Sequence, residues 1–198
     1  KEIWKLSFKD AINKYKCLTN YSLKTIDIME DEIKNLVIKN KKLELKDGNK
    51  IQPSLEARVC ASILSIKKLM ANNTIKKVIS YHRLKKRASK FSKYFSKFID
   101  DETFSKHTFS NFVTGEHKVS ERNRLIENFK SSNFSLLANA RCLIEGVDIP
   151  EADTVIFVDP KKSSTDIIQA IGRVIRKLRD KTFVKKKNFK SFNCTDYL

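Results

Sequence analysis

Three polar side chains interrupt the apolar sequence DIIQAIGRVIRK, which covers residues 166–177. They are Gln169, Arg173 and Arg176, and on a helix their spacing places them within about 60° of one another. Two arginines beside a glutamine could clamp a polyphosphate, because each guanidinium offers a planar, bidentate fork of donors. An exposed helix face that forms ion pairs would have the same composition. The helix alone leaves both interpretations open.

The same segment has a well-defined start and a separate apolar face. Ile167, Ile171 and Val174 form a stripe suited to packing on a sheet. The sequence SSTD at 163–166 offers N-cap hydroxyls and the carboxylate of a capping box. Gly172 costs about 1 kcal/mol of helix propensity relative to Ala, which the close approach of another backbone or a ligand would explain.

Strand-like and helix-like segments alternate from residue 76 onward. Runs of β-branched and aromatic residues predict strands, and apolar residues at intervals of three and four predict helices between them. The expected strands are 76–82, 107–113, 134–140 and 153–159, and the expected helices are 83–99, 120–129 and 164–177. This alternation predicts an α/β fold, with a parallel sheet flanked by helices and ligands at the carboxyl ends of its strands.

The helix expected at 83–99 has an aromatic stripe that could be mistaken for a base-stacking surface. A stripe that faces the protein core is the better interpretation, because its residues follow the helical repeat. The members of the stripe are Leu84, Ala88, Phe91, Phe95 and Phe98.

Residues 1–75 are less regular and predict a lead-in that packs on the sheet of the domain at 76–198. A short helix is expected at 7–15, a strand at 22–29 and another helix at 30–40. A long helix follows, with Leu55, Val59, Ile63, Ile66 and Met70 on one side. The last residues, 182–198, are either a final strand with a basic extension or the start of a further region.

The composition excludes several classes of protein. No apolar run approaches the roughly 20 residues that a bilayer-spanning helix needs. The four cysteines are scattered without a CxxC pair, which indicates reduced cytoplasmic thiols and no metal site. A net charge of +18 is compatible with nucleic acid as a partner. Because 32 of the 41 basic residues are lysines, part of that charge reflects compositional bias.

Several segments together resemble the second motor domain of superfamily 2 helicases and translocases. EGVDIP at 145–150 is similar to motif V, QAIGRVIR at 169–176 to motif VI, and KVISYHRL at 77–84 occupies the place of motif IV. The resemblance covers about residues 76–178, with a weaker one at 4–23. It points to the bacterial, phage and restriction-enzyme branch and implies a RecA-like domain of the P-loop NTPase type.

The resemblance implies roles for the residues that face the nucleotide. Gln169 would line the cleft near the phosphates, and Arg173 and Arg176 would reach the γ-phosphate, with Arg176 as the arginine finger. Gly146 would allow a close backbone approach. Asp148 would contact the ribose or the water network near the metal. ATP and Mg²⁺ are the implied cofactors.

The resemblance also implies a nucleic-acid surface built at strand ends, which reads phosphate and sugar and favours DNA over RNA. The implied contacts are His82, Arg83, Thr114, Gly115, His117, Asn139 and Arg141. Ala140 stands where many members of the family have a Thr, so that contact would have to come from Asn139 or Arg141.

Neither a GxxxxGK[ST] phosphate loop nor a DExx-type metal-binding motif occurs in the sequence. We therefore expect the chain alone to be inactive and to share ATP and Mg²⁺ with an N-terminal RecA-like domain of the same parent chain. Three alternatives remain: a non-hydrolysing nucleic-acid-binding domain on a degenerate motor fold, a structural interaction domain, and a dinucleotide enzyme. The missing GxGxxG sequence disfavours the last of these.

Overall fold

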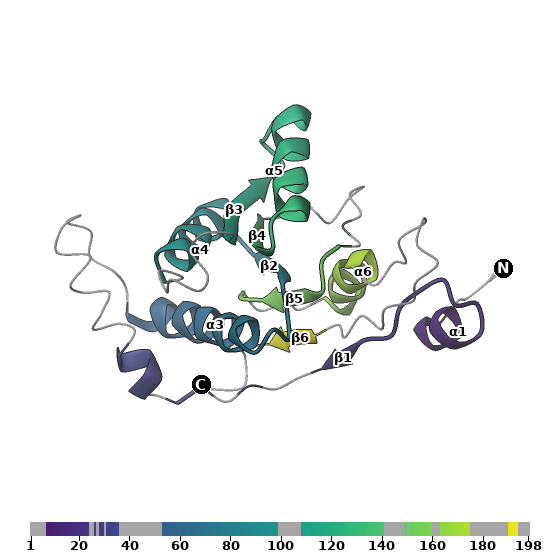
Figure 1. Ribbon diagram of the computed structural model, residues 1–198, viewed down its shortest axis with the longest axis horizontal. Coiled ribbons are helices and arrows are strands. Elements are labelled where there is room, and N and C mark those ends of the chain that lie inside the picture. Colours follow the sequence, from purple (N-terminus) through teal and green to yellow (C-terminus); the bar gives the residue numbers. More distant parts are fainter. Residues whose placement is uncertain are drawn as a thin grey trace.

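The computed structural model describes residues 7–23, 26, 28–29, 31–35, 53–98, 108–140, 149, 151–159, 163–174 and 190–193. In this part of the chain, six strands form one sheet in the order β1-β6-β5-β2-β4-β3, and every neighbouring pair is parallel (Figure 1). The four strands predicted from residue 76 onward are all present, as β2 (Lys77–His82), β3 (Thr108–Thr114), β4 (Phe134–Ala140) and β5 (Thr154–Phe157). The predicted parallel sheet is confirmed.

Two short strands from the ends of the chain extend the sheet beyond β5. β6 (Lys190–Asn193) pairs with β5, and β1 (Ser22–Leu23) pairs with β6. A strand therefore forms within 182–198, as one of the two interpretations of that segment proposed. The strand expected at 22–29 is shorter than predicted, because residues 26, 28 and 29 are described and lie outside any strand.

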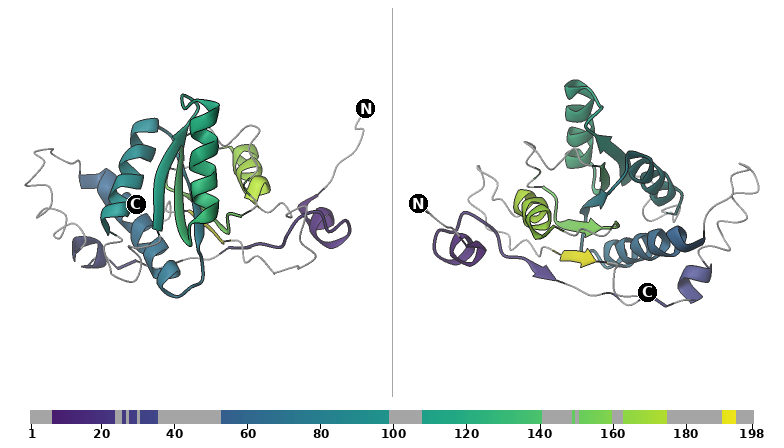
Figure 2. Two further views of the ribbon diagram at one scale, coloured as in Figure 1. Left: turned by 45° about the horizontal axis from the view of Figure 1, so that its top comes forward. Right: turned by 180° about the vertical axis from the view of Figure 1, so that it is seen from behind.

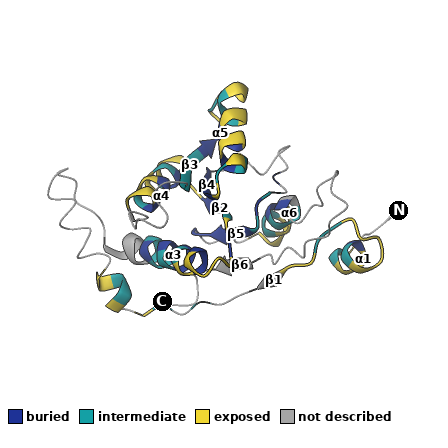
Figure 3. Cartoon of the chain, viewed as in Figure 1, coloured by how far each residue is buried: buried dark blue, intermediate teal, exposed yellow. Residues whose placement is uncertain are grey.

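Helices cover both faces of the sheet. α3 (Pro53–Ala71) and α4 (Lys85–Phe98) pack on one face, and α5 (Val119–Ser131) and α6 (Ser164–Val174) pack on the other. Figure 2 (left) shows α4 and α5 on opposite sides of the strands. The strands β2, β4 and β5 are buried almost throughout, whereas the outer helix faces are exposed (Figure 3).

The aromatic stripe on α4 faces the core, as predicted. Ala88, Phe91 and Phe95 are buried completely or almost so. Leu84 was expected in the same stripe, but its side chain is 49% exposed. The reason is that Leu84 precedes the helix: its carbonyl accepts the first α4 backbone bonds, from the N–H groups of Arg87 and Ala88, beyond the end of β2. The side chain of Phe98 lies outside the described residues.

Residues that precede β2 in the chain pack on both faces of the sheet. On α3, Ile63, Ile66 and Met70 are buried in the core. The helix ends at Ala71, and in the turn after it Asn73 has a φ of 50°, a conformation that Asn tolerates. The predicted helix at 7–15 is α1 (Phe8–Asn13), and the ring of Phe8 joins the apolar cluster beneath α6. Residues 31–35 are also helical.

No described helix is long and apolar enough to cross a bilayer. Cys17 and Cys60 are present as thiols, and Cys142 and Cys194 lie outside the described residues.

The amino edge of the sheet is held by two sets of charged hydrogen bonds. The carboxylate of Asp153, just before β5, accepts the backbone N–H groups of Lys76 and Lys77 at 2.7 and 3.1 Å. The Lys77 ammonium donates to the carbonyls of Phe129, Lys130 and Ser132 at 2.8, 2.7 and 2.6 Å. Because these carbonyls end α5, a cation there also interacts favourably with the helix dipole.

Lys77→Ala should therefore destabilise the fold. Loss of the charged donor leaves three carbonyls at the end of α5 without it, and we expect the free energy of unfolding to fall by about 2–3 kcal/mol. Urea denaturation followed by circular dichroism measures this change. Lys76→Ala is the matched control: the side chain of Lys76 is exposed, so its removal should cost less than about 0.5 kcal/mol. Equal effects of the two substitutions would contradict the assignment.

Candidate functional site

The register of the sheet brings several predicted site residues to one level at its carboxyl edge. His82 on β2 lies opposite Ala140 on β4, and Ala140 lies opposite Thr114 on β3. One residue earlier, Asn139 on β4 pairs with Tyr81 of β2. The predicted strand-end contacts from three different segments therefore adjoin one another in space.

His82 is in the interior rather than on the surface. Its side chain is 3% exposed, its Nε2 atom lies 3.0 Å from the hydroxyl of Ser80, and its ring packs 4.8 Å from that of Phe91. Burial lowers the pKa of His82 to about 4, and the carboxylate of Asp159 opposes this shift only in part. The imidazole is therefore neutral at pH 7, and its geometry suits it to supporting the end of β2.

The turn from β2 to α4 is anchored by a carboxylate from the neighbouring strand. Asp159, two residues after β5, is 5% exposed. One of its oxygens accepts the backbone N–H of Arg83 at 2.7 Å, and the other accepts the guanidinium of Arg87. This hydrogen bond from the Arg83 N–H to Asp159 fixes the backbone of Arg83, whose side chain is exposed.

The turn from β3 to α5 contains three more of the predicted contacts. Gly115 is exposed with nothing within 4 Å of a Cβ built there, and the N–H of His117 donates to the carbonyl of Thr114 at 3.3 Å. Arg122 on α5 donates to the carbonyl of His117 at 3.4 Å and so supports the turn. The hydroxyl of Thr114 and Nδ1 of His117 are shielded from solvent and have no hydrogen-bond partner among the described residues.

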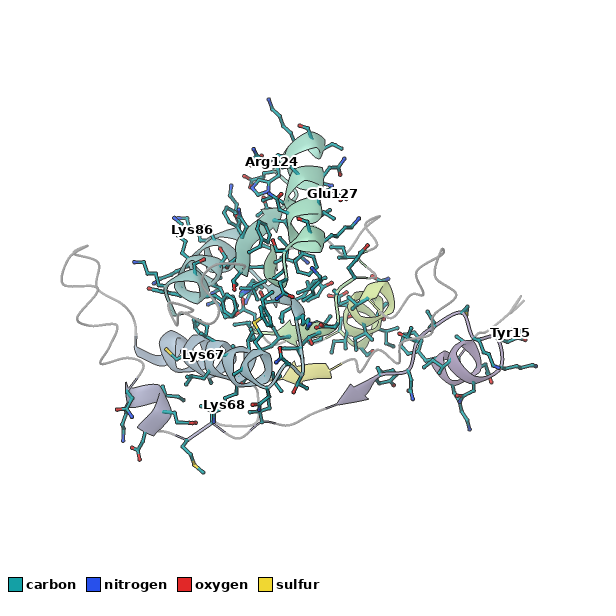
Figure 4. The ribbon with its side chains drawn as sticks, in the orientation of Figure 1. Tyr15, Lys67, Lys68, Lys86, Arg124 and Glu127 are labelled. Atoms are coloured by element: carbon teal, nitrogen blue, oxygen red, sulfur yellow. The ribbon has the colours of Figure 1, made fainter. Side chains whose placement is uncertain are left out.

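An exposed ion pair joins these two turns. Lys85, at the start of α4, contacts the carboxylate of Glu116 in the turn after β3. Both side chains are mostly exposed, so the pair contributes little to stability. Lys86 on α4 and Arg124 on α5 project outward from the same two helices (Figure 4). The carboxyl edge is thus bordered by basic side chains.

α6 packs beside β5 and has one buried face and one exposed face, as its sequence predicts. Ala170 and Val174 are buried against the sheet, with Ile171 packed beside them, while Gln169 is exposed. The hydroxyl of Ser163 accepts the N–H of Asp166 at 3.2 Å, which confirms the predicted N-cap.

A Cβ added at Gly172 would meet only the ring of Phe8, at an ordinary contact distance of 4.0 Å. The described residues therefore do not require a glycine at this position.

Several predicted residues lie outside the part of the chain that the structure describes. These are Gly146, Asp148, Arg141 and Arg176, and of Arg173 only the backbone is described, one turn after Gln169 on α6. Their predicted roles stay predictions.

Sequence reasoning missed the anchoring residues Asp159, Arg87 and Arg122. A signal for the first was present, because an acidic residue at the end of a predicted strand lies at the same edge as the basic turn after the neighbouring strand.

A family model described as the helicase conserved C-terminal domain matches residues 61–177, which is more than half of the 198 residues. The chain belongs to this family. The matched span begins within α3 and ends just after α6, so it includes the central strands and the helices on both faces. The resemblance inferred from the motifs is thereby confirmed.

Curated relatives of this helicase C-terminal domain match over short spans. IRC3 of Saccharomyces cerevisiae, named as an ATP-dependent helicase, is 36% identical over 67 residues, which is 34% of this chain and 10% of that protein. UvrABC system protein B of Helicobacter pylori is 30% identical over 96 residues, which is 43% of this chain and 15% of that protein. The chain thus spans a small part of these relatives.

Solved structures share the fold over a larger part of the chain. The ATP-dependent Type ISP restriction-modification enzyme LlaBIII, bound to DNA, covers 98% of this chain with a TM-score of 0.65 and 20% identity, over 13% of its own length. The C-terminal part of the Fun30 ATPase domain covers 78% of this chain with a TM-score of 0.54 and 16% identity, over 47% of its length. The fold is the RecA-like arrangement of helicase C-terminal domains.

The buried His82 should make stability depend on pH. The folded chain keeps the imidazole neutral down to about pH 4, whereas the unfolded chain binds a proton near 6.5. Since the unfolded state binds more protons between these values, this contribution to the free energy of unfolding falls by roughly 3 kcal/mol as the pH drops through the interval. Urea denaturation at several pH values should show a shallower decline for His82→Gln than for the unchanged chain. Parallel declines would contradict the assignment.

Gly172→Ala should leave the fold intact and raise its stability by up to about 1 kcal/mol, because alanine favours the helix and the nearest group among the described residues, the ring of Phe8, is 4.0 Å away. Thermal denaturation measures the change. A lowered melting temperature would show that a further group of the chain packs against this position.

Proposed function

We propose that this chain is the C-terminal motor domain of an ATP-dependent nucleic-acid helicase or translocase and that it supplies motifs IV, V and VI, including the arginine finger. The observation that carries the proposal is the division of α6. Ala170 and Val174 are buried against the sheet, while Gln169 faces solvent and Arg173 follows one turn later on the same side of the helix. A helix with this division can present polar groups to a nucleotide held by another domain.

The exposed amide of Gln169 fits a phosphate-bearing ligand that approaches α6 from outside. In the proposal, Gln169 lines the cleft, Arg173 and Arg176 approach the γ-phosphate, and Gly146 and Asp148 complete the nucleotide side. ATP, when bound, would supply the transferable phosphoryl group and the free energy for movement. In the described part of the chain, no three His, Cys, Asp or Glu side chains gather as a metal site, so Mg²⁺ is assigned no ligand there.

The carboxyl edge is the proposed nucleic-acid surface, and DNA is favoured because the LlaBIII neighbour is bound to DNA. Arg83 and Gly115 are exposed and can contact phosphate directly, by a guanidinium and by a backbone N–H. His117 is partly exposed beside them. Thr114 and Asn139 are buried at the strand ends, and we assign them to shaping this surface.

The proposed partner is an N-terminal RecA-like domain of the same parent chain, which would hold most of the ATP and Mg²⁺. Closure of the two domains around ATP would bring α6 to the phosphates, and reopening would move the nucleic acid. In this proposal the protein acts in the cytoplasm, and the chain alone does not hydrolyse ATP. A non-hydrolysing DNA-binding domain is the outcome to exclude.

Arg176→Ala in the full protein should reduce DNA-stimulated ATP turnover by about 10³-fold or more while ATP binding is retained, because a finger stabilises charge that develops in the transition state. Steady-state turnover with and without DNA, together with binding of a fluorescent ATP analogue, measures both quantities. Lys76→Ala, at an exposed position at the amino edge of the sheet, is the control and should keep the turnover of the unchanged protein.

The same turnover measurement on Arg173→Ala determines which of the two arginines is the finger. If turnover collapses in Arg173→Ala and survives in Arg176→Ala, the finger is Arg173 and the motor assignment stands. If the unchanged protein binds DNA but hydrolyses no ATP under any condition, the motor assignment is wrong and the non-hydrolysing alternative replaces it.

A further inference from the structure

Two aspartates flank β5, and the carboxylate of each accepts hydrogen bonds from backbone N–H groups at one end of β2. Asp153, before the strand, accepts the backbone N–H groups of Lys76 and Lys77 at the start of β2. Asp159, after the strand, accepts the backbone N–H of Arg83 at 2.7 Å, just past the end of β2. The two carboxylates therefore fix the two ends of the same neighbouring strand. They differ in what lies beside them, since only Asp159 is at the carboxyl edge.

The turn held by Asp159 has an unfavourable concentration of positive charge. Arg83, Lys85, Lys86 and Arg87 fall within five residues, and the first turn of α4 contains no acidic residue. The amino end of a helix already carries a partial positive charge, so these cations destabilise the turn. The Asp159 carboxylate, which binds both the Arg83 backbone and the Arg87 guanidinium, supplies a buried counter-charge from another strand.

The charge that Asp159 offsets is of the kind that a phosphate backbone would use. The side chains of Arg83 and Lys86 are exposed, and Lys85 touches only the exposed carboxylate of Glu116 among its ion pairs in the described residues. The partly exposed Arg87 guanidinium is paired with the buried Asp159 carboxylate, whereas the side chains of Arg83 and Lys86 face solvent. The exposed cations of the turn that have no ion pair among the described residues are therefore the ones that a phosphate ligand would meet first.

Asp159 also precedes α6 closely in the chain. The helix begins at Ser164, five residues later, and carries Gln169 on its exposed face.

We propose that Asp159 is a positioning residue, which holds the basic turn Arg83–Arg87 in the conformation that binds the nucleic-acid phosphates. The proposal rests on the proposed function for its ligand. It concerns contacts that are independent of the arginine finger, so the two can fail separately.

The test uses the full protein that carries this chain, with Asp159→Asn, Arg87→Gln, the double variant, and Asp153→Asn as the matched control. Asparagine keeps an acceptor for the backbone N–H and removes the charge. Three quantities are measured: the Kd for a fluorescein-labelled DNA duplex by anisotropy, ATP turnover as a function of DNA and of ATP concentration, and the melting temperature.

Asp159→Asn should raise the Kd for DNA by about tenfold, since a charged hydrogen bond of this kind is typically worth at least that factor. The KM for ATP should change less than about twofold. Arg87→Gln should weaken DNA binding similarly, and the double variant should resemble the single ones because the two residues act as one unit. Asp153→Asn should lower the melting temperature without changing the Kd.

Equal changes in DNA affinity for Asp159→Asn and Asp153→Asn would overturn the proposal, because both carboxylates would then act only on stability. An unchanged Kd in Asp159→Asn and Arg87→Gln would overturn it as well. If the unchanged protein shows no ATP turnover, the proposed motor function fails, and the Kd values alone decide the role of Asp159. If Asp159→Asn does not fold, the Kd of Arg87→Gln decides the proposal, because the Arg87 side chain is partly exposed and its substitution should disturb the fold less.

Discussion

The parallel pairing of β2 with both β4 and β5 is the constraint on which the rest of the molecule depends. β2 is buried on both faces, and its register places His82 beside Ala140 and places Phe157, at the end of β5, beside Tyr81. A slip of one residue would exchange the side chains that face α4 with those that face α6. The backbone ladder therefore determines which turns adjoin at the carboxyl edge and which side chains they present.

Charge is handled differently at the surface and inside this strongly basic chain. Most lysines in the described part of the chain are exposed, and an exposed pair such as Lys85 with Glu116 adds little. Two charged groups that enter the structure have several partners instead: Asp159 has two donors, and the Lys77 ammonium has three carbonyl acceptors. A net charge of +18 thus coexists with a compact sheet because the few charges near the core are paired or hydrogen-bonded.

The fold could be predicted from the sequence because its signals are local and repeated. The N-cap at Ser163 and the stripe on α4 depend on residues within one or two helical turns. The N-cap is confirmed, and so are the stripe positions Ala88, Phe91 and Phe95, whereas Leu84 is exposed. The burial of His82 could not be predicted, because it depends on how Phe91 and Asp159 pack around the end of β2 from two other elements. The anchoring by Asp159 is likewise a contact across 76 residues of sequence, which no periodicity reveals.

The contacts that stabilise the sheet lie at its amino edge, and the residues of the proposed nucleic-acid surface lie at its carboxyl edge. At the amino edge, Asp153 and Lys77 satisfy backbone groups at the start of β2 and the end of α5. At the carboxyl edge, the Thr114 hydroxyl and His117 Nδ1 are shielded without a partner in the described residues, and basic side chains crowd the start of α4. Such features cost free energy, and a fold tolerates them where its remaining contacts are strong. The charged hydrogen bonds of Asp153 and Lys77 at the amino edge therefore help the fold to tolerate a carboxyl edge that suits a ligand better than it suits stability.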